Sequence, residues 1–289
     1  TSTLSAFEHT PNKSSFSAQN LIIFIGGLFD GLGTVPYVTY LSDSLPNSWS
    51  LSQVVLSSSY KGWGTSSLQN DVQELSKCIE YFRRIKKGLF VLLGHSTGCQ
   101  DIMEYLTGPG HKIRASIDGA ILQAPVSDRE IICVSLSPSI YAQACLDAQK
   151  MIDADHGDKI LSTHKDIENL FPCPLSAYRW LSLASPNKDG DDDYFSSDLT
   201  LEQLRNSFGK LDTPLCIVIS GADEYMPESI NKEALLAQWA NVVENGQGKY
   251  DSKHSSILEG ASHSLSKNGK EIVDNFVERV VGFLGSLPA

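Results

Sequence analysis

The sequence predicts an α/β fold in which a mostly parallel, twisted sheet is flanked by helices. Short apolar runs rich in branched residues alternate along the chain with longer segments of helical period, a pattern typical of strand–helix–strand units. The chain has 289 residues, of which 41% are hydrophobic and 20% charged, so it is long enough for a sizeable core and lacks the composition of a disordered or fibrous protein. We therefore expect one α/β domain over residues 1–289.

The apolar runs are predicted to be strands buried on both faces of the sheet. They occupy residues 21–25, 53–56, 89–93, 115–122, 214–220 and 255–258. Between the second and third runs, apolar residues recur at steps of three and four among polar ones, which predicts an amphipathic crossover helix. These apolar residues are Val72, Leu75, Ile79 and Phe82. Further helices are predicted over residues 99–106, 232–243 and 271–284.

Residues 125–212 interrupt this alternation. They contain one clear helical stretch, residues 139–152, followed by irregular sequence with several prolines and an acidic run at residues 189–193. Because an ordinary connection takes about 2 to 6 residues, we expect a lid inserted into the domain, with short helices of its own. The acidic run lacks the alternate spacing and the later glutamate of a calcium loop, so we interpret it as a solvated loop.

Composition excludes several classes of partner. The formal net charge of −11 opposes binding to a phosphate backbone, so we expect no nucleic acid. No apolar run approaches the roughly 20 residues that span a bilayer, and the polar residues 1–19 do not resemble a signal peptide, so we expect a cytoplasmic protein without a membrane partner. The six cysteines form no metal-binding pattern and are expected as free thiols. Nothing in the sequence indicates an oligomeric state.

A serine motif directly follows the strand predicted over residues 89–93. Residues 94–98 read Gly-His-Ser-Thr-Gly, which is the G-x-S-x-G pattern, and a helical segment comes next. Between a strand and a helix this pattern forms a sharp turn, where side chains at the glycine positions would collide with the neighbouring elements. We therefore predict that Ser96 is a nucleophile and that the Thr97 amide, at the start of a helix, faces an oxyanion.

A serine nucleophile needs a base, and the base needs a carboxylate to orient it. Of the seven histidines, His263 is the best placed, because it lies in a short loop of small residues between the last apolar run and the last long helix. Asp223 follows the strand predicted over residues 214–220 and is the expected carboxylate. Glu224 is the alternative, because sequence does not fix where a strand ends. The order serine, acid, histidine is that of the α/β-hydrolase fold.

The glycine-rich loop after the first predicted strand is expected to complete the oxyanion hole. Its Leu28 amide is the predicted partner of the Thr97 amide, and its glycines allow the backbone to approach a substrate closely. The spacing of these glycines is neither G-x-G-x-x-G nor that of a phosphate-binding loop, so we expect no nucleotide. The chemistry needs no metal and no organic cofactor. The residues expected to contact the substrate are Gly27, Phe29, Trp63 and His95.

Four blocks of this sequence resemble the DUF1749 group of α/β-hydrolases of fungi and plants. The more specific of them contain Ala-Pro-Val-Ser-Asp-Arg and Asp-Tyr-Phe-Ser-Ser-Asp. The blocks are residues 93–101, 123–130, 192–199 and 220–227. Met226 stands where a valine is expected, a conservative difference. The resemblance implies an esterase with a Ser-His-Asp triad, and the best known activity of the group is that of fungal fusarinine siderophore esterases.

Taken together, the sequence predicts a serine hydrolase that cleaves a small-molecule carboxylic ester through an acyl-enzyme, with siderophores or other secondary-metabolite esters as candidate substrates. Two alternatives stay open. The first is an acyltransferase or thioesterase, whose acyl-enzyme would release a biosynthetic product to an acceptor. The second is a binding protein that has the same fold but hydrolyses no substrate.

Overall fold

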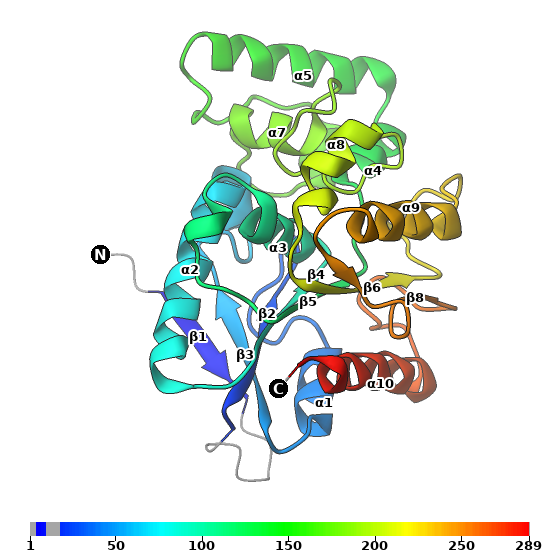
Figure 1. Cartoon of the computed structure of the whole chain (residues 1–289). Coiled ribbons are helices and arrows are strands. Elements are labelled where there is room, and N and C mark those ends of the chain that lie inside the picture. The colour runs from blue at the N-terminus through cyan, green and yellow to red at the C-terminus, as the bar shows by residue number, and fades with distance from the viewer. Residues whose placement is uncertain (1–3, 10–17, 289) are drawn as a thin grey trace.

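The structure, a computed structural model, describes residues 4–9 and 18–288. In this part of the chain one eight-stranded sheet has helices on both of its faces (Figure 1). The strands are β1 (Ser5–Glu8), β2 (Asn20–Ile25), β3 (Trp49–Val55), β4 (Phe90–His95), β5 (Gly119–Gln123), β6 (Pro214–Ser220), β7 (Lys249–Tyr250) and β8 (Ser256–Leu258). Their order is β1-β3-β2-β4-β5-β6-β7, and β8 also pairs with β6. Only β1 is antiparallel to its neighbour among these pairs, so the mostly parallel sheet is confirmed.

The central strands end level with one another. Ile25 of β2 is in register with Gly94 of β4, and His95 at the end of β4 is in register with Gln123 at the end of β5. Gln123 in turn aligns with Val218 of β6. The loops that follow these strands therefore leave the sheet at one edge, which is where sites of open α/β sheets lie.

Helices cover both faces of the sheet and one of its ends. They are α1 (Tyr37–Ser44), α2 (Leu68–Ile85), α3 (Gly98–Thr107), α4 (Asp128–Ser135), α5 (Pro138–Asp153), α6 (Lys165–Leu170), α7 (Ala177–Ala184), α8 (Leu201–Asn206), α9 (Lys232–Glu244) and α10 (Lys270–Ser286). Short 3₁₀ turns lie at Gly62–Thr65, His111–Ile113 and Phe208–Lys210.

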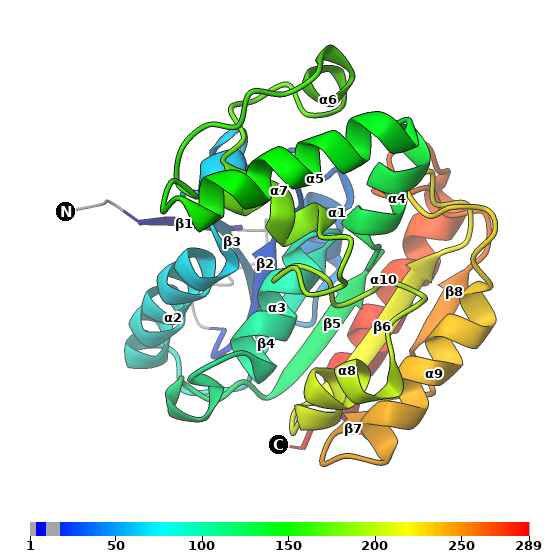
Figure 2. The same cartoon turned by 90° about the horizontal axis from the view of Figure 1, so that it is seen from above.

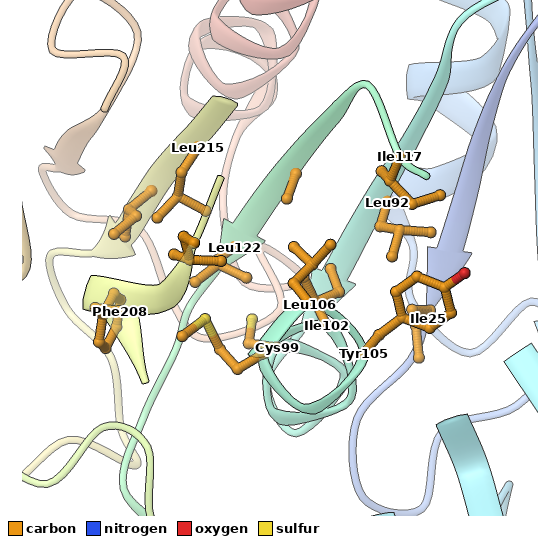
Figure 3. Close-up of a cluster of buried hydrophobic side chains, with 14 of the residues drawn as sticks. Ile25, Leu92, Cys99, Ile102, Tyr105, Leu106, Ile117, Leu122, Phe208 and Leu215 are labelled. Carbon is orange, nitrogen blue, oxygen red and sulfur yellow. The ribbon is translucent and has the colours of Figure 1, made fainter. Parts of the chain in front are cut away.

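Alternate residues of β2 face two separate cores, because successive side chains of a strand point to opposite faces. Leu21, Ile23 and Ile25 pack with residues of α2, α3 and α9. Ile22 and Phe24 pack on the other face with residues of α1 and α10. Part of the first core, where α3 lies on the strands, is shown in Figure 3, and the helices can be followed from above in Figure 2. Burial on both faces explains the uninterrupted apolar run.

Helix α2 is the crossover helix that the sequence predicts. The Ser67 hydroxyl accepts a hydrogen bond from the Asn70 amide at 3.2 Å and caps the first turn, a contact that stabilises a helix by about 1 kcal/mol. Val72, Leu75 and Ile79 lie on its buried face. The helix thus returns the chain from the end of β3 to the start of β4.

The long segment between β5 and β6 carries α4, α5, α6, α7 and α8, and none of its residues, all of which are described, belongs to the sheet. Helices α4, α5 and α7 share a third core around Trp180, and Trp63 from the loop after β3 joins it. Phe195 and Phe208 belong instead to the first core. Figure 1 shows α5 and α7 stacked beyond one end of the strands.

Some strands differ from the prediction. The edge strand β1 has four exposed residues, so no apolar run marks it, and β7 has only two residues. The strand predicted over residues 53–56 begins earlier, at Trp49, and the one predicted over residues 115–122 begins later, at Gly119. The predicted N-terminal segment, residues 1–19, lies largely outside the described residues.

The acidic run at residues 189–193 is only in part the solvated loop that the sequence suggested: Asp189 and Asp191 are exposed, but Asp192 and Asp193 form ion pairs inside the protein. The Asp192 side chain is only 1% exposed and accepts a hydrogen bond from Arg179 at 2.5 Å. The Asp193 carboxylate is bound by Arg129 at 2.7 Å. Both arginines lie on helices of the same insertion, and their partners are too distant in sequence for a local pattern to reveal the pairing.

Candidate active site

Ser96 stands on a tight turn between β4 and α3, with a left-handed backbone at φ 54°. A Cβ atom on Gly94 would lie 2.5 Å from the carbonyl oxygen of Gly98, and one on Gly98 would lie 2.3 Å from that of Ile25. Neither contact is sterically allowed, so the turn requires glycine at both positions. The Ser96 amide donates to the Gln123 carbonyl oxygen at 3.0 Å, which fixes the turn against β5.

The loop that follows β8 brings His263 to Asp223, which lies in the loop after β6. The Nδ1 atom of His263 lies 2.9 and 2.8 Å from the two carboxylate oxygens of Asp223, whose side chain is completely buried. An ionised carboxylate only accepts hydrogen bonds, so we assign the imidazole proton to Nδ1. The Nε2 atom then keeps its lone pair and is able to take a proton.

Ser96 and His263 line one cavity of about 440 Å³. They reach it from different elements, Ser96 from the turn after β4 and His263 from the loop after β8. Apolar side chains of Leu28, Phe29 and Phe171 form part of the wall. The cavity therefore offers a serine hydroxyl and an oriented imidazole beside space for a small molecule.

Glu224, the alternative carboxylate, contacts the backbone of the histidine and not its ring. One of its oxygens accepts a hydrogen bond from the His263 amide at 2.8 Å, and the other pairs with Lys267 at 2.8 Å. Partial burial alone would raise the pKa of Glu224, but these hydrogen bonds outweigh burial and lower its pKa to about 2. The geometry thus assigns Asp223 to the ring and leaves Glu224 ionised beside it.

The Leu28 and Thr97 amides donate to no protein acceptor among the described residues. The loop that carries Leu28 is fixed by Asp30, whose carboxylate accepts from the Gly27 amide at 2.8 Å. A Cβ on Gly27 would lie 2.6 Å from the Cβ of Ser96, so glycine is required for this close approach. Leu28 lines the cavity of Ser96, and Thr97 follows Ser96 in the chain, so both amides lie close to the serine without a protein acceptor.

Of the residues expected to contact the substrate, some line the cavity of Ser96 and others do not. Phe29 and His95 line the cavity of Ser96. Trp63 does not line it, because it is 2% exposed and lies behind Phe29 and Phe171, with ring centroids 5.2 Å from each. Gly27 is not among the lining residues of this cavity, although it closely approaches Ser96, and it borders a separate small internal space. Trp63 thus supports the wall from a second layer.

His95 is buried next to His263, with their ring centroids 4.9 Å apart. Its Nδ1 lies 2.5 Å from Oε1 of Gln123, and the Nε2 of that glutamine donates to the His263 carbonyl oxygen at 3.0 Å. Because Oε1 can only accept, we assign the His95 proton to Nδ1. Burial and the neighbouring His263 lower the pKa of His95 to about 4, so it is neutral at pH 7.

Sequence reasoning missed Gln123 and Tyr225 at this site, and it named Glu224 only as the alternative carboxylate for the ring. Gln123 connects the turn of Ser96 to the loop of His263 through its backbone and side-chain hydrogen bonds. Glu224 binds the His263 amide, and the Tyr225 ring packs edge-on against the His263 ring with centroids 4.8 Å apart. The signal for Gln123 was its position at the end of a central strand. The contacts of Glu224 and Tyr225 depend on how two distant loops meet, which no local pattern shows.

A buried charged cluster lies behind the Leu28 loop. Arg179, which is 3% exposed, stands among carboxyl groups from α2, α3, α4 and its own segment. Burial, only partly opposed by Arg179, raises the pKa of Asp71 to about 6 and that of Asp128 to about 7. Burial and repulsion from neighbouring aspartates raise the pKa of Asp101 as well. One guanidinium therefore faces several acids, some of which hold protons.

Within residues 4–9 and 18–288, no group of three or more histidine, cysteine, aspartate or glutamate side chains is arranged to hold a metal ion. The cysteines of the described chain are free, and Cys99, Cys145 and Cys216 are buried while Cys133 is exposed. In the same part of the chain, every helix is too short or too polar to cross a membrane.

The sheet order, the serine turn after a central strand and the chain order of serine, acid and histidine define an α/β-hydrolase. Solved structures agree. The siderophore hydrolase EstB from Aspergillus fumigatus superposes with a TM-score of 0.85 at 35% identity, over 99% of this chain and 95% of that one. A soluble variant of monoglyceride lipase from Saccharomyces cerevisiae, at 14% identity and a TM-score of 0.60 over 99% of this chain and 92% of that one, shows the fold alone.

The chain belongs to the family described as "Protein of unknown function (DUF1749)", whose profile matches residues 1–285. The fusarinine C esterase SidJ of Aspergillus fumigatus is 35% identical to it over 99% of this chain and 94% of that protein. An esterase of Emericella nidulans is 34% identical over 98% of this chain and 90% of its own length. The predicted family is confirmed, and the chain is an ester-hydrolysing enzyme.

Proposed function

We propose that the protein is a serine esterase in which Ser96, His263 and Asp223 form a catalytic triad. The observation that carries the proposal is the Asp223–His263 hydrogen bond, at 2.8 Å, in a site whose cavity also exposes Ser96 on a turn with φ 54°. A buried carboxylate that holds Nδ1 of an imidazole leaves Nε2 free to act as a base toward a serine hydroxyl.

In the proposed reaction the Ser96 hydroxyl attacks the ester carbonyl carbon while Nε2 of His263 takes its proton. The Leu28 and Thr97 amides donate hydrogen bonds to the oxyanion of the tetrahedral intermediate. The imidazolium gives its proton to the departing alkoxide, which leaves as an alcohol. A water molecule then attacks the acyl-enzyme with His263 as base, and the carboxylic acid is released. Asp223 keeps the imidazole in one tautomer throughout.

The insertion is proposed to act as a lid over this cavity, as the sequence suggests for residues 125–212. Ile131 of α4, Leu170 of α6 and Phe171 contribute to the cavity wall. Their apolar side chains would cover the acyl or alcohol part of a substrate and keep water from it. The part of the insertion with its own core, around Trp180, is the part that carries this wall.

For the substrate, we propose a small-molecule carboxylic ester, with esters of siderophores or other secondary metabolites as the class to test first. The relatives that are similar over nearly the whole chain include a fusarinine C esterase and a siderophore hydrolase. A cavity of about 440 Å³ with a largely apolar wall accommodates one arm of such a molecule.

The experiment is a comparison of the wild type with Ser96→Ala on p-nitrophenyl butyrate and on iron-free and iron-loaded hydroxamate esters. We expect a loss of at least about 10³-fold in kcat with an unchanged melting temperature. Covalent labelling of Ser96 by a fluorophosphonate should occur in the wild type only. Unchanged turnover in Ser96→Ala would refute the triad, absence of labelling would favour a binding protein, and ester formation with an added alcohol in place of hydrolysis would identify a transferase.

A further inference from the structure

We propose that Glu224 is a positioning residue that fixes the backbone of His263, so that the imidazole is held at its main chain as well as at its ring. The inference rests on the proposed triad and adds a residue to it. Two consecutive residues of one loop bind the same histidine: Asp223 binds Nδ1 of its ring, and Glu224 binds its backbone amide.

His263 needs such a contact because it lies outside regular secondary structure. It belongs to the stretch between β8, which ends at Leu258, and α10, which begins at Lys270. Both of its backbone polar groups are bound by side chains: the amide donates to Glu224 at 2.8 Å, and the carbonyl oxygen accepts from Gln123 at 3.0 Å. The Ser220 hydroxyl also donates to this carbonyl oxygen, at 3.4 Å, and the Ala222 amide donates to the Ala261 carbonyl oxygen at 2.9 Å. Among the described residues, Glu224 is the acceptor for the His263 amide, and neither a strand nor a helix provides another.

A carboxylate suits this position. The pKa of Glu224 is lowered to about 2, so the group is ionised at any pH at which the protein would act. A hydrogen bond from a backbone amide to an ionised acceptor is shorter and stronger than one to a neutral acceptor. Lys267 binds the second oxygen of Glu224 at 2.8 Å and limits its rotation, although the Lys267 side chain is itself exposed. The acceptor is therefore held in place before substrate binds.

The consequence for catalysis is geometric. Proton transfer from Ser96 to His263 requires hydrogen-bond distance, and a displacement of about 1 Å at a reacting group can cost about 10²-fold in rate. Loss of the Glu224 acceptor leaves the His263 amide without its partner and frees the loop to shift. Glu224 also borders the cavity of Ser96. The effect should nevertheless appear mainly in kcat, because the contact that the proposal assigns to Glu224 is to the backbone of the base.

The test compares two substitutions of similar size in the full chain, Glu224→Gln, which keeps an acceptor oxygen, and Glu224→Met, which has none. With p-nitrophenyl butyrate we expect Glu224→Met to lower kcat about 10- to 100-fold, with KM changed less than about threefold. The rate of Ser96 labelling by a fluorophosphonate should fall in parallel. Glu224→Gln should recover most of the lost rate. The matched control is Glu228→Ala, an exposed glutamate of the same loop, which should behave as the wild type.

Wild-type kcat in Glu224→Met would overturn the proposal. So would equal defects in Glu224→Gln and Glu224→Met, since an acceptor oxygen at this position would then make no difference to the rate. Ser96→Ala is measured alongside: if that variant stays active, the proposed triad itself fails, whereas an inactive Ser96→Ala with an unaffected Glu224→Met removes only the positioning role.

Discussion

Replacing Asp128 with asparagine should change how the stability of the protein depends on pH. This carboxyl group at the start of α4 is 9% exposed, and burial, followed by repulsion from Asp192, raises its pKa from 3.8 to about 7. Asparagine keeps the shape of the side chain and an oxygen that can accept the hydrogen bond from Gln100, which is 2.7 Å long in the wild type. The substitution therefore removes the titration with little change in packing.

The sign and size of the effect follow from proton linkage. The folded pKa is higher than the unfolded one, so between them the folded state holds a proton that the unfolded state has lost. The stabilising contribution of the proton is complete below about pH 4 and disappears as the pH rises through 7. Between about pH 5 and pH 7 the folded state holds roughly one proton more than the unfolded state. The free energy of unfolding should therefore fall by about 1.4 kcal/mol per pH unit, or about 3 kcal/mol over this interval.

The assay is urea unfolding of the wild type and of Asp128→Asn at pH 5, 6, 7 and 8. The difference in unfolding free energy between the two proteins should shift by about 3 kcal/mol across this range, with the asparagine variant gaining relative to the wild type as the pH rises. Asp43→Asn, at an exposed aspartate of α1, is the control and should show a constant difference. A constant difference for Asp128→Asn as well would mean that Asp128 is ionised throughout, and the burial argument would be wrong.

Two further substitutions test the framework of the site. Gly98→Ala places a Cβ 2.3 Å from the carbonyl oxygen of Ile25. We therefore expect the free energy of unfolding to fall by about 1–3 kcal/mol and ester turnover to be largely lost. A variant with normal melting temperature and activity would show that the turn tolerates a side chain. Arg179→Met leaves Asp192 buried without its cation, so we expect the free energy of unfolding, measured with urea, to fall by about 3–5 kcal/mol at pH 7. The decrease should be smaller at pH 5, where carboxyl groups gain protons. An equal decrease at both pH values would refute the role of charge.

Features that depend on local chemistry could be predicted from the sequence. The run at residues 21–25 reads as a strand because both of its faces are buried, and the glycines at 94 and 98 mark the serine turn because no side chain fits there. The loops after β6 and β8 could be assigned to the same edge of the sheet from the parallel topology, which placed Asp223 and His263 near Ser96.

Features that depend on contacts between distant segments could not be predicted from the sequence. The buried pairing of Asp192 with Arg179 satisfies a charge that, taken alone, belongs on the surface. Trp63 lies in the second layer because the insertion packs over the loop after β3, a contact without sequence period. The edge strand β1 is exposed on every residue, so hydrophobicity gives it no signal, and its pairing with β3 alone defines it.

The raised pKa values behind the Leu28 loop matter for the proposed reaction as well as for stability. Asp71, Asp101 and Arg179 border the same small internal space as the backbone of Leu28 and Thr97. If all the acids around Arg179 were ionised, their field would oppose a negative charge forming at those amides, and a buried site screens such charges poorly. Burial raises the pKa of Asp101 and favours its neutral form, whereas Asp71, with a pKa of about 6, is mostly ionised at pH 7 and is offset by Arg179. In the proposed reaction, a neutral Asp101 would lower the electrostatic cost of forming the oxyanion at those amides.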